Sequence, residues 1–311
     1  MDKKTQLETT AARKRRQEAT DRAYSAYYAA YEQSLKKGYL HSGYRVFRLQ
    51  EAQPQPVAFH YHDFHKIILF LAGDVDYIIE GRTWHLEPRD LIFVPAGAIH
   101  RPVYQPDGNG YSRIVIYVAP TFLAHWSAES RDGTDLGRCF TLGAGVRHQT
   151  ESRSHDLLFH MDKLAKTAQG QGFANDLYTQ ILFVEFLILV NRSLEEHELT
   201  ALAAKQSDAK IQQVLQYIGA HLTEDLSVEN IARDNYLSTS YLMHKFKADT
   251  GYSLHQYVQN KRLLLACDLL SKDDTPVTAI SASCGFQDYS TFSRAFRKHY
   301  QCTPKEWRER H

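Results

Sequence analysis

The sequence predicts an α+β multidomain protein: an N-terminal antiparallel β-barrel with flanking helices, then an all-α domain of two helix-turn-helix units. Three observations support this fold class. The 311 residues suffice for two ordinary domains. Short apolar runs broken by turn residues extend from Tyr44 to Tyr117, whereas the apolar spacing becomes helical after Asp208. Within that helical region one unit occurs twice, which indicates an internal repeat.

Composition and charge argue against a strongly basic protein, a disulfide-rich secreted protein and a membrane-spanning protein. The formal net charge is +1 and the hydrophobic content is 43%, as in a globular protein without a bulk basic charge. The four cysteines are scattered without a CxxC pair, as in a cytoplasmic protein with reduced thiols. A polar segment follows Met1, so we expect no signal peptide. The longest apolar run, Ile181 to Val190, contains Glu185 and is too short to cross a membrane.

Residues 1–43 are charged and helix-prone, and we expect a helical N-terminal extension or arm there. Residues 13–16 form a basic cluster, and tyrosines recur at helical spacing at positions 24, 27, 28 and 31. The simplest interpretation is a solvated helix whose tyrosines pack on the body of the protein. The alternatives are an arm in the DNA minor groove, a cover over a ligand pocket and a contact with a partner subunit.

A first domain is expected over residues 44–192, and its first half alternates strands with turns. Apolar runs at roughly ten-residue spacing indicate strands at 66–71, 77–79, 91–94 and 114–118. The dipeptide Glu80-Gly81 predicts a tight hairpin, while Pro95 and Gly97 predict the end of an edge strand. This spacing is typical of an antiparallel barrel or sandwich.

Two helices are expected to close this domain after an irregular, glycine-containing connection from Pro120 to about Gln149. The first helix spans His155 to Ala168, and the longer second helix spans Phe173 to Glu196. The second helix is apolar around most of its circumference, which is more surface than one barrel can cover. It is therefore our candidate for a homodimer interface, with burial inside the monomer as the alternative.

The apolar periodicity fades over residues 193–208, which we interpret as an interdomain linker that is in part helical. The second domain is expected over residues 209–311. It contains the two copies of the repeated unit, and a helix from Leu254 to Leu270 joins them as a rigid rod.

The second copy shows the pattern most clearly. Val277 and Ile280 share one face of a short helix, and Gly285 can adopt the left-handed conformation that a tight turn needs. Asp288 then offers an N-cap oxygen to a second helix. The buried face of that helix carries Phe292 and Phe296. A short helix, a turn and a capped amphipathic helix make a helix-turn-helix.

The first copy repeats this pattern with one residue fewer in the turn. Val228 and Ile231 correspond to the apolar pair of the first helix, and Leu237 corresponds to Phe286 in the turn. Ser238 caps the second helix, which buries Leu242 and Phe246.

This second domain resembles the DNA-binding domain of the AraC family of bacterial transcription regulators over roughly the last hundred residues. The residues that carry the resemblance are Lys261, Arg262, Leu263, Ala266, Leu269, Leu270, Val277, Ile280, Gly285, Phe286, Ser290, Phe292, Phe296, Arg297, Pro304, Trp307 and Arg308. Agreement at so many spaced positions is more specific than any three-residue motif. The resemblance implies a monomer that places two recognition helices in successive major-groove segments on one face of double-stranded DNA.

We expect the beginning of each recognition helix to reach base edges. The candidate residues are Ser240, Met243 and His244 in the first copy and Tyr289, Ser290, Thr291 and Arg294 in the second. Arg294 is the best candidate for guanine, because its guanidinium matches two major-groove acceptors. Four basic side chains are expected to touch phosphates: Lys245, Lys247, Arg297 and Lys298. An ordinary solvated helix face is the alternative for these four.

The first domain resembles the cupin (jelly-roll) sensor domain of AraC-type regulators. The residues that carry this resemblance are His60, His62, Gly73, Pro95, Ala96, Gly97 and His100. Metal-binding cupins hold an ion with three histidines and a glutamate, but Lys66 stands at the glutamate position here. Arg89 also replaces a glycine, and Tyr104 replaces an asparagine. We therefore expect neither metal nor cofactor; if an ion binds, His60, His62 and His100 would hold it.

Without a metal, the barrel is expected to hold a small-molecule effector such as a sugar or a related metabolite. The candidate residues are His60, His62, Lys66, Tyr77, Trp84 and His100, which offer hydrogen bonds, a cation and aromatic faces. Lys66 and the histidines also suit an anionic effector. Strand alternation leaves the facing of Tyr77 and Trp84 open, so each can instead be a core residue.

These features predict a transcription regulator, most simply an activator, rather than an enzyme. The sequence shows no nucleophile–base pair, phosphate-binding loop or paired carboxylates, so we name no catalytic residue. The expected partners are double-stranded DNA, the effector, a second copy of the chain and RNA polymerase, and no membrane. Two alternatives are a metal-binding cupin enzyme or metal sensor fused to a DNA-binding tail, and a constitutive regulator whose barrel only dimerises.

Overall fold

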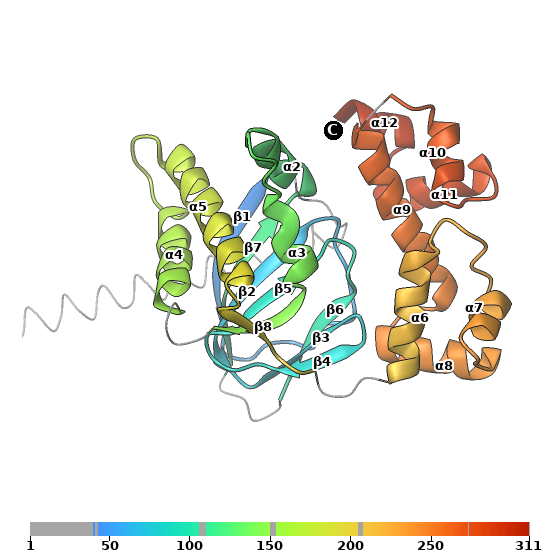
Figure 1. Ribbon diagram of the computed structural model, residues 1–311, viewed down its shortest axis with the longest axis horizontal. Helices are drawn as coiled ribbons and strands as arrows, with labels where there is room; N and C mark the ends of the chain where they lie inside the picture. Colours follow the sequence, from blue (N-terminus) through green and yellow to red (C-terminus); the bar gives the residue numbers. More distant parts are fainter. Residues whose placement is uncertain are drawn as a thin grey trace, which may run out of the picture.

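The computed structural model of the protein describes residues 40, 43–105, 110–149, 154–204, 208–272 and 274–310. A β-sandwich carries helices on one outer face, and a bundle of helices stands at its other side (Figure 1). We call the part from β1 to β9 the barrel and the part from α6 to α12 the tail. The basic cluster and the tyrosine stripe predicted near the N-terminus lie outside the described residues.

The barrel consists of two antiparallel sheets, which confirms the fold class predicted for this part. The larger sheet has the strand order β1-β7-β2-β5-β8-β9, and the smaller one has the order β4-β3-β6. The strands are β1 (Tyr44–Glu51), β2 (His65–Gly73), β3 (Val75–Ile79), β4 (Arg82–His85), β5 (Leu91–Val94), β6 (His100–Tyr104), β7 (Tyr111–Val118), β8 (Gly145–Gln149) and β9 (Leu199–Ala201).

The predicted hairpin is present between β3 and β4. Glu80 and Gly81 have φ angles of 46° and 73°, so both central residues are left-handed, as a two-residue hairpin turn requires. The prediction that β5 is an edge strand is wrong, because β5 lies between β2 and β8. Strand β8 comes from a segment that looked irregular in sequence, so nothing indicated that it would cover this edge.

The connection from Pro120 to Gln149 is more regular than its glycines suggested. It contains α2 (Pro120–Ala128), η1 (Leu136–Arg138) and α3 (Cys139–Leu142) before β8. Pro120 occupies the first turn of α2, where a missing backbone N–H costs nothing. That proline was the available signal for a helix start.

Two apolar layers hold the barrel together. One lies between the sheets and includes Phe47, Ile68, Phe70, Tyr77 and Tyr117. The other lies between the larger sheet and the helices, including α4 (Ser154–Thr167) and α5 (Asn175–Glu195), which Figure 1 shows on the side away from the tail. Because side chains alternate across a strand, the same strands supply both layers.

Among the described residues, one helix, α5, is long and apolar enough to cross a membrane, judged by length and composition alone. The run Ile181 to Val190, which alone is too short to cross a membrane, lies within this helix. One face of α5 is buried against the barrel through Phe183, Phe186 and Leu187, as in the core helix of a globular domain. The other face leaves Leu177 and Ile181 exposed, at 56% and 51% of their surface.

The predicted linker, residues 193–208, is helical at its start and contains a short strand further on. Its first residues, through Glu195, belong to α5, and Leu199 to Ala201 form β9 on the edge of β8. Leu199 is buried in the outer layer, and the Trp84 indole N–H donates a 3.0 Å hydrogen bond to the Leu202 carbonyl. These contacts hold residues 199–202 against the barrel.

The tail confirms the predicted pair of helix-turn-helix units. Its helices are α6 (Ala209–Ala220), α7 (Val228–Asp234), α8 (Thr239–Thr250), α9 (Leu254–Lys272), α10 (Val277–Ser283), α11 (Tyr289–Tyr300) and α12 (Pro304–Arg310). Ser238 and Asp288 cap α8 and α11 by accepting hydrogen bonds from the amides of Tyr241 and Thr291. Each unit has its own apolar cluster, and α9 contributes to both.

Both turns need a residue with a positive φ angle, and each turn uses a different residue type. Gly285 adopts a φ of 84° between α10 and α11, and Tyr236 adopts a φ of 56° at the equivalent position between α7 and α8. The Tyr236 side chain is 94% exposed, so little packing compensates for the left-handed conformation. At Gly285 a Cβ would lie only 2.9 Å from the Thr223 carbonyl oxygen, so the second turn also excludes a side chain sterically.

We therefore expect Tyr236→Gly to stabilise the first helix-turn-helix by about 1 kcal/mol, because glycine removes the left-handed strain. Native-state hydrogen exchange of α7 and α8 amides in the full chain measures the change. Gly285→Ala is the matched control and should destabilise the second unit by about 1–2 kcal/mol. A Tyr236→Gly protein with unchanged or faster exchange would show that the tyrosine is not strained.

Candidate functional site

The recognition helices α8 and α11 present the residues that sequence analysis selected. Exposed side chains form most of this surface: Ser240, Met243, His244, Lys247, Tyr289, Ser290, Thr291, Arg294, Arg297 and Lys298. The opposite faces are buried through Phe246 and Phe296, whose rings anchor the helices in the two apolar clusters. Amphipathic helices capped at the N-terminus thus leave their first turns open to a groove.

Arg294 lies along the exposed side of α11. Its Nε is 3.3 Å from the Ser290 carbonyl oxygen, and a terminal nitrogen is 3.5 Å from the Thr291 hydroxyl. Both contacts are local and long, so the guanidinium can turn outward at little cost. Thr291 also donates its hydroxyl to Asp288 at 2.7 Å, which fixes the start of the helix.

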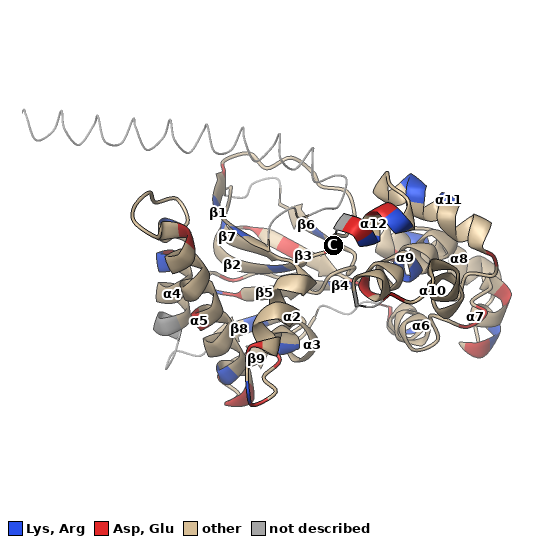
Figure 2. Ribbon diagram, turned by 90° about the horizontal axis from the view of Figure 1, so that it is seen from above, with Lys and Arg blue, Asp and Glu red and all other residues tan. Residues whose placement is uncertain are grey.

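The basic residues expected at phosphates differ in their surroundings. Lys247, Arg297 and Lys298 are exposed, and Figure 2 shows a basic segment on α11. Lys245 is half-buried and makes a 2.7 Å ion pair with Asp249 one turn later. Lys245 must therefore leave this carboxylate before it can reach a phosphate, which makes it the weakest of the four candidates.

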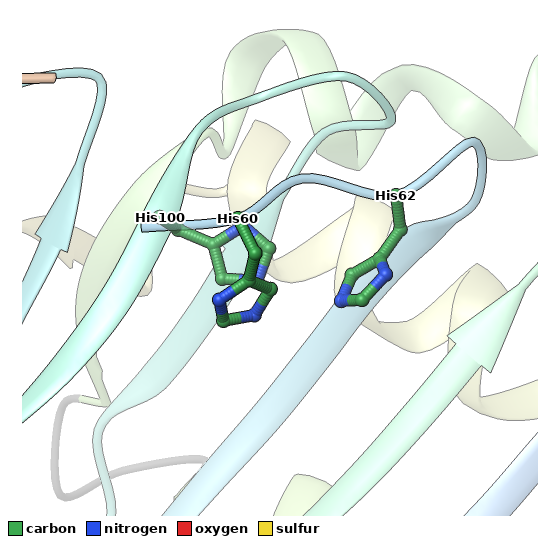
Figure 3. A group of neighbouring side chains, drawn as sticks. All are labelled: His60, His62 and His100. Atoms are coloured by element: carbon green, nitrogen blue, oxygen red, sulfur yellow. The ribbon is translucent and has the colours of Figure 1, made fainter. Parts of the chain in front are cut away.

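A second group of predicted residues converges inside the barrel. His60 and His62 come from the segment before β2, His100 opens β6, and Figure 3 shows the three rings turned toward one another. Each ring offers one nitrogen that lies within 4.8 Å of the corresponding nitrogens of the other two. Two backbone hydrogen bonds of 3.1 and 2.8 Å join His60 and His100 and hold their rings side by side.

Backbone carbonyls fix the orientation of two of these rings. His60 Nδ1 lies 2.8 Å from the Ala58 oxygen, and His100 Nδ1 lies 2.9 Å from the Ala98 oxygen. A carbonyl only accepts, so each Nδ1 carries the proton and a neutral ring has its lone pair on Nε2. His62 Nδ1 is buried without a hydrogen-bond partner among the described residues.

Burial keeps these imidazoles neutral. Burial, and after it the positive charge of Lys66, lowers the pKa of His60 to about 4. The pKa values of His62 and His100 lie well below the usual range, again through burial first and Lys66 second. Neutral imidazoles can accept hydrogen bonds from a ligand or donate a lone pair to a metal ion.

Lys66 completes the cluster from strand β2. The residue is only 6% exposed, and its Nζ lies 3.0 Å from His100 Nε2, to which the ammonium group donates. The same Nζ lies 5.2 Å from the centre of the Tyr117 ring, which faces Lys66 across the β2–β7 ladder. The site therefore presents one cation beside several hydrogen-bond acceptors.

The two aromatic candidates have different positions. Tyr77 is buried beside the histidines, with its ring centre 6.1 Å from that of His100. Trp84 instead reaches the linker through Leu202 and lines a cavity of about 360 Å³ between the barrel and the tail. Trp84 thus lies where the barrel meets the linker and the tail.

Sequence reasoning missed two aromatic walls of the site. Phe64 stacks on His62 with ring centres 4.5 Å apart, and Tyr117 lies against Phe64 at 4.7 Å. The alternation of His60, His62 and Phe64 was the available signal for the first, because residues two apart share a face of an extended segment. Tyr117 comes from a strand far along the chain, and no local pattern reveals it.

Three imidazoles with unprotonated nitrogens suit an ion such as Zn²⁺, which accepts three protein ligands and a water. The carbonyls of Ala58 and Ala98 supply the outer support that metal-bound histidines usually have. Lys66 opposes this arrangement, because its ammonium group bonds to the nitrogen that His100 would give to the ion. Residues that fit an ion are thus present, together with a cation that competes with it.

Comparisons with known proteins agree with both parts of the molecule. The family model described as "AraC-like ligand binding domain" matches residues 44–187, and the one described as "Helix-turn-helix domain" matches residues 231–310. The chain belongs to the AraC family of transcription regulators. As an AraC-family regulator it combines a ligand-binding domain with a helix-turn-helix domain that binds DNA.

Curated relatives share most of the length of this AraC-family chain. The "HTH-type transcriptional activator RhaS" of Enterobacter sp. (strain 638) is 26% identical over 276 residues, 86% of this chain and 94% of that protein. The protein of the same name from Citrobacter koseri is 27% identical over 257 residues, 80% of this chain and 87% of that protein. A Listeria innocua structure of unknown function is 31% identical and covers 32% of this chain and 96% of its own, with a TM-score of 0.32.

Two variants separate base reading from charge on α11. We expect Arg294→Ala to cost about 1–3 kcal/mol on the preferred DNA sequence and to relax the preference at one position. Lys298→Ala should weaken binding to all sequences alike, because a phosphate contact carries no sequence information. Binding of the full chain to sites selected from a random DNA pool, and to point variants of them, measures both. Equal losses on every sequence for Arg294→Ala would remove it from the readout.

Proposed function

We propose that the protein is a transcription activator whose binding to double-stranded DNA is controlled by a small-molecule effector held at His60, His62, Lys66 and His100. The observation that supports this is a buried cation among neutral imidazoles inside a ligand-binding domain. The relatives named as activators support the direction of control. We place the protein in the cytoplasm, with RNA polymerase as a further partner, and propose no enzymatic activity.

The cluster suits an effector with several hydroxyl groups, such as a sugar. The Nε2 lone pair of His60 accepts a hydrogen bond from a hydroxyl group. Lys66 already donates to His100 Nε2, and its remaining protons can be donated to hydroxyl or carboxylate oxygens. The Tyr77 ring offers an apolar face beside them. A neutral sugar and a sugar acid both use this set, and the acid gains an ion pair with Lys66.

A thermal-shift panel of sugars and sugar acids identifies the class of effector. The binding sugar should stabilise the full chain by about 2.7 kcal/mol at one hundred times its Kd. Lys66→Met and His100→Ala should abolish the shift, whereas His125→Ala, at an exposed position on α2, should keep it. A shift that survives both cluster variants would place the effector elsewhere, and an effector that leaves DNA binding unchanged would contradict the proposed control.

A metal sensor is the second candidate, because Ala58 and Ala98 orient two imidazoles as they are oriented in metal sites. His60, His62 and His100 would hold the ion, which would supply Lewis-acid charge at the centre of the cluster. In the same experiment, Zn²⁺ replaces the sugars. Zinc that binds wild type, fails with His100→Ala and binds Lys66→Met more tightly supports a sensor; absence of binding to Lys66→Met excludes it.

We also propose that two chains associate through α4 and α5. Exposed apolar side chains gather there: Phe159, Phe173, Leu177, Tyr178 and Ile181. Exposed apolar side chains in this number on and beside two helices that pack together are typical of an association surface. A second copy of the chain is the occupant, because the patch lies on the side of the barrel away from the tail (Figure 1).

Ile181→Asp should convert the dimer into a monomer, because a carboxylate in an apolar interface loses its hydration without gaining a partner. Sedimentation velocity of the full chain measures the mass. Glu185→Ala, an exposed polar position on the same helix, is the control and should leave the dimer intact. A wild-type chain that sediments as a monomer at micromolar concentration would refute this interface.

A further inference from the structure

The segment that carries the histidines also holds the tail. Residues 59–64 alternate strictly between two neighbours. His60, His62 and Phe64 face the barrel, where their rings contact one another. Phe59 and Tyr61 instead pack against the apolar cluster of the first helix-turn-helix. This is the alternation of an extended strand with an occupied face on each side.

The adjoining strand shows the same division. His100 is paired with His60 by two backbone hydrogen bonds and turns into the histidine cluster. Its neighbour Ile99 is only 1% exposed and belongs to the apolar cluster of the tail. Segment 59–63 and residues 98–100 together form what we call the shared ribbon, with the ligand cluster on one face and the tail on the other.

The outer face of the shared ribbon touches both helix-turn-helix units. At the first unit, the Tyr252 hydroxyl donates to the Phe59 carbonyl at 3.3 Å, and Gly251 lies so close to the Phe59 ring that a Cβ would be 2.5 Å from it. At the second unit, Tyr61 lies parallel to His299 of α11, with its hydroxyl 3.3 Å from His299 Nε2.

A further set of contacts fastens the same strand to α9. Glu80 accepts from the Ile99 amide at 3.1 Å, from the Tyr257 hydroxyl at 2.7 Å and from Lys261 at 2.9 Å. One carboxylate thus joins the backbone beside His100 to two side chains of the tail. Charge-assisted hydrogen bonds of this kind are short and directional, so they transmit a displacement well.

We propose that the shared ribbon transmits the occupancy of the histidine cluster to the DNA-binding tail, with Phe59, Tyr61 and Ile99 as positioning residues. The proposal rests on the proposed role of the cluster as the ligand site. A ligand that draws the rings of His60, His62 and His100 together, or spreads them, must move the backbone they share with the outer residues. The tail then docks on a changed surface, which couples the two sites.

The required movement is small. The ring nitrogens lie within 4.8 Å of one another. A tetrahedral ion with metal–nitrogen distances of about 2.0–2.1 Å needs nitrogens about 3.3 Å apart. Contraction by up to about 1.5 Å is comparable with the helix shifts that regulate protein interfaces, which are about 1–2 Å. Zinc alone is therefore a suitable probe of this coupling, whatever the natural effector.

Hydrogen exchange of the full chain, with and without Zn²⁺, tests the proposal at the amides of residues 250–253 and 298–301. We expect zinc to change exchange there at least threefold. His100→Ala should change the same amides without any metal, because it removes the ring on which His60 packs. His125→Ala, at an exposed position on α2, is the matched control and should leave them unchanged.

If the cluster affects the tail, a change on the tail side of the ribbon must also affect binding at the cluster, which gives a second measurement. Phe59→Ala and the milder Tyr61→Phe alter only the outer face, yet each should shift the apparent zinc affinity at least threefold, measured by chelator competition. Zinc that binds at the histidines while the tail amides stay unchanged would overturn the proposal. If zinc does not bind, the His100→Ala exchange decides alone, and unchanged amides overturn it.

The outcome is separable from that of the proposed function. Transcription from a reporter that responds to an effector in wild type, and equally in Phe59→Ala and Tyr61→Phe, would leave the function standing and refute the shared ribbon. Coupled exchange in a protein whose DNA binding responds to none of the sugars, sugar acids or zinc would support the ribbon and refute effector control.

Discussion

The pair of backbone hydrogen bonds between His60 and His100 is the interaction on which the rest of the site depends. It fixes two segments that are distant in sequence into one extended ribbon. Once that register is set, alternation decides which side chains enter the barrel and which reach the tail. A shift by one residue would exchange the two sets and destroy the histidine cluster and the docking surface together.

The histidine cluster beside the ribbon contains polar groups whose burial costs free energy. The site holds neutral imidazoles and a lysine, and His62 Nδ1 has no hydrogen-bond partner in the part of the chain that the structure describes. Buried polar groups are costly unless they are hydrogen-bonded. The Ala58 and Ala98 carbonyls satisfy part of this demand and orient the rings. A ligand that satisfies the remainder would bind an organised site and would lose little conformational entropy in doing so.

Much of the tail could be predicted from sequence, because its signals are local. The caps at Ser238 and Asp288 and the left-handed glycine at position 285 each depend on a few adjacent residues. Strands of the barrel could also be predicted, but the edge of its larger sheet could not. Strands β8 and β9 form that edge by pairing residues that are far apart in the sequence, so no short window of sequence reveals it. The DNA contacts and effector residues remain predictions, since exposure and proximity show access but not binding.

The candidate ligand site shows where local reasoning ends. The facing of His60 and His62 followed from their spacing, but the role of Trp84 depended on a linker that returns to the barrel as a strand. Glu80 looked like a turn residue, and it is one, yet its carboxylate also binds Tyr257 and Lys261. Contacts between domains combine residues that have no pattern in common, so only the folded chain reveals them.

Two basic side chains of the tail form ion pairs inside the protein. The net charge of +1 gives no bulk attraction to DNA, so we expect affinity to depend on a few cations of the recognition helices. Lys245 is paired with Asp249 within α8, and Lys261 is paired with Glu80 of the barrel. Part of the basic charge of the tail is thus neutralised inside the protein. Because such pairs compete with phosphates, a small change in docking can alter DNA affinity without refolding either part.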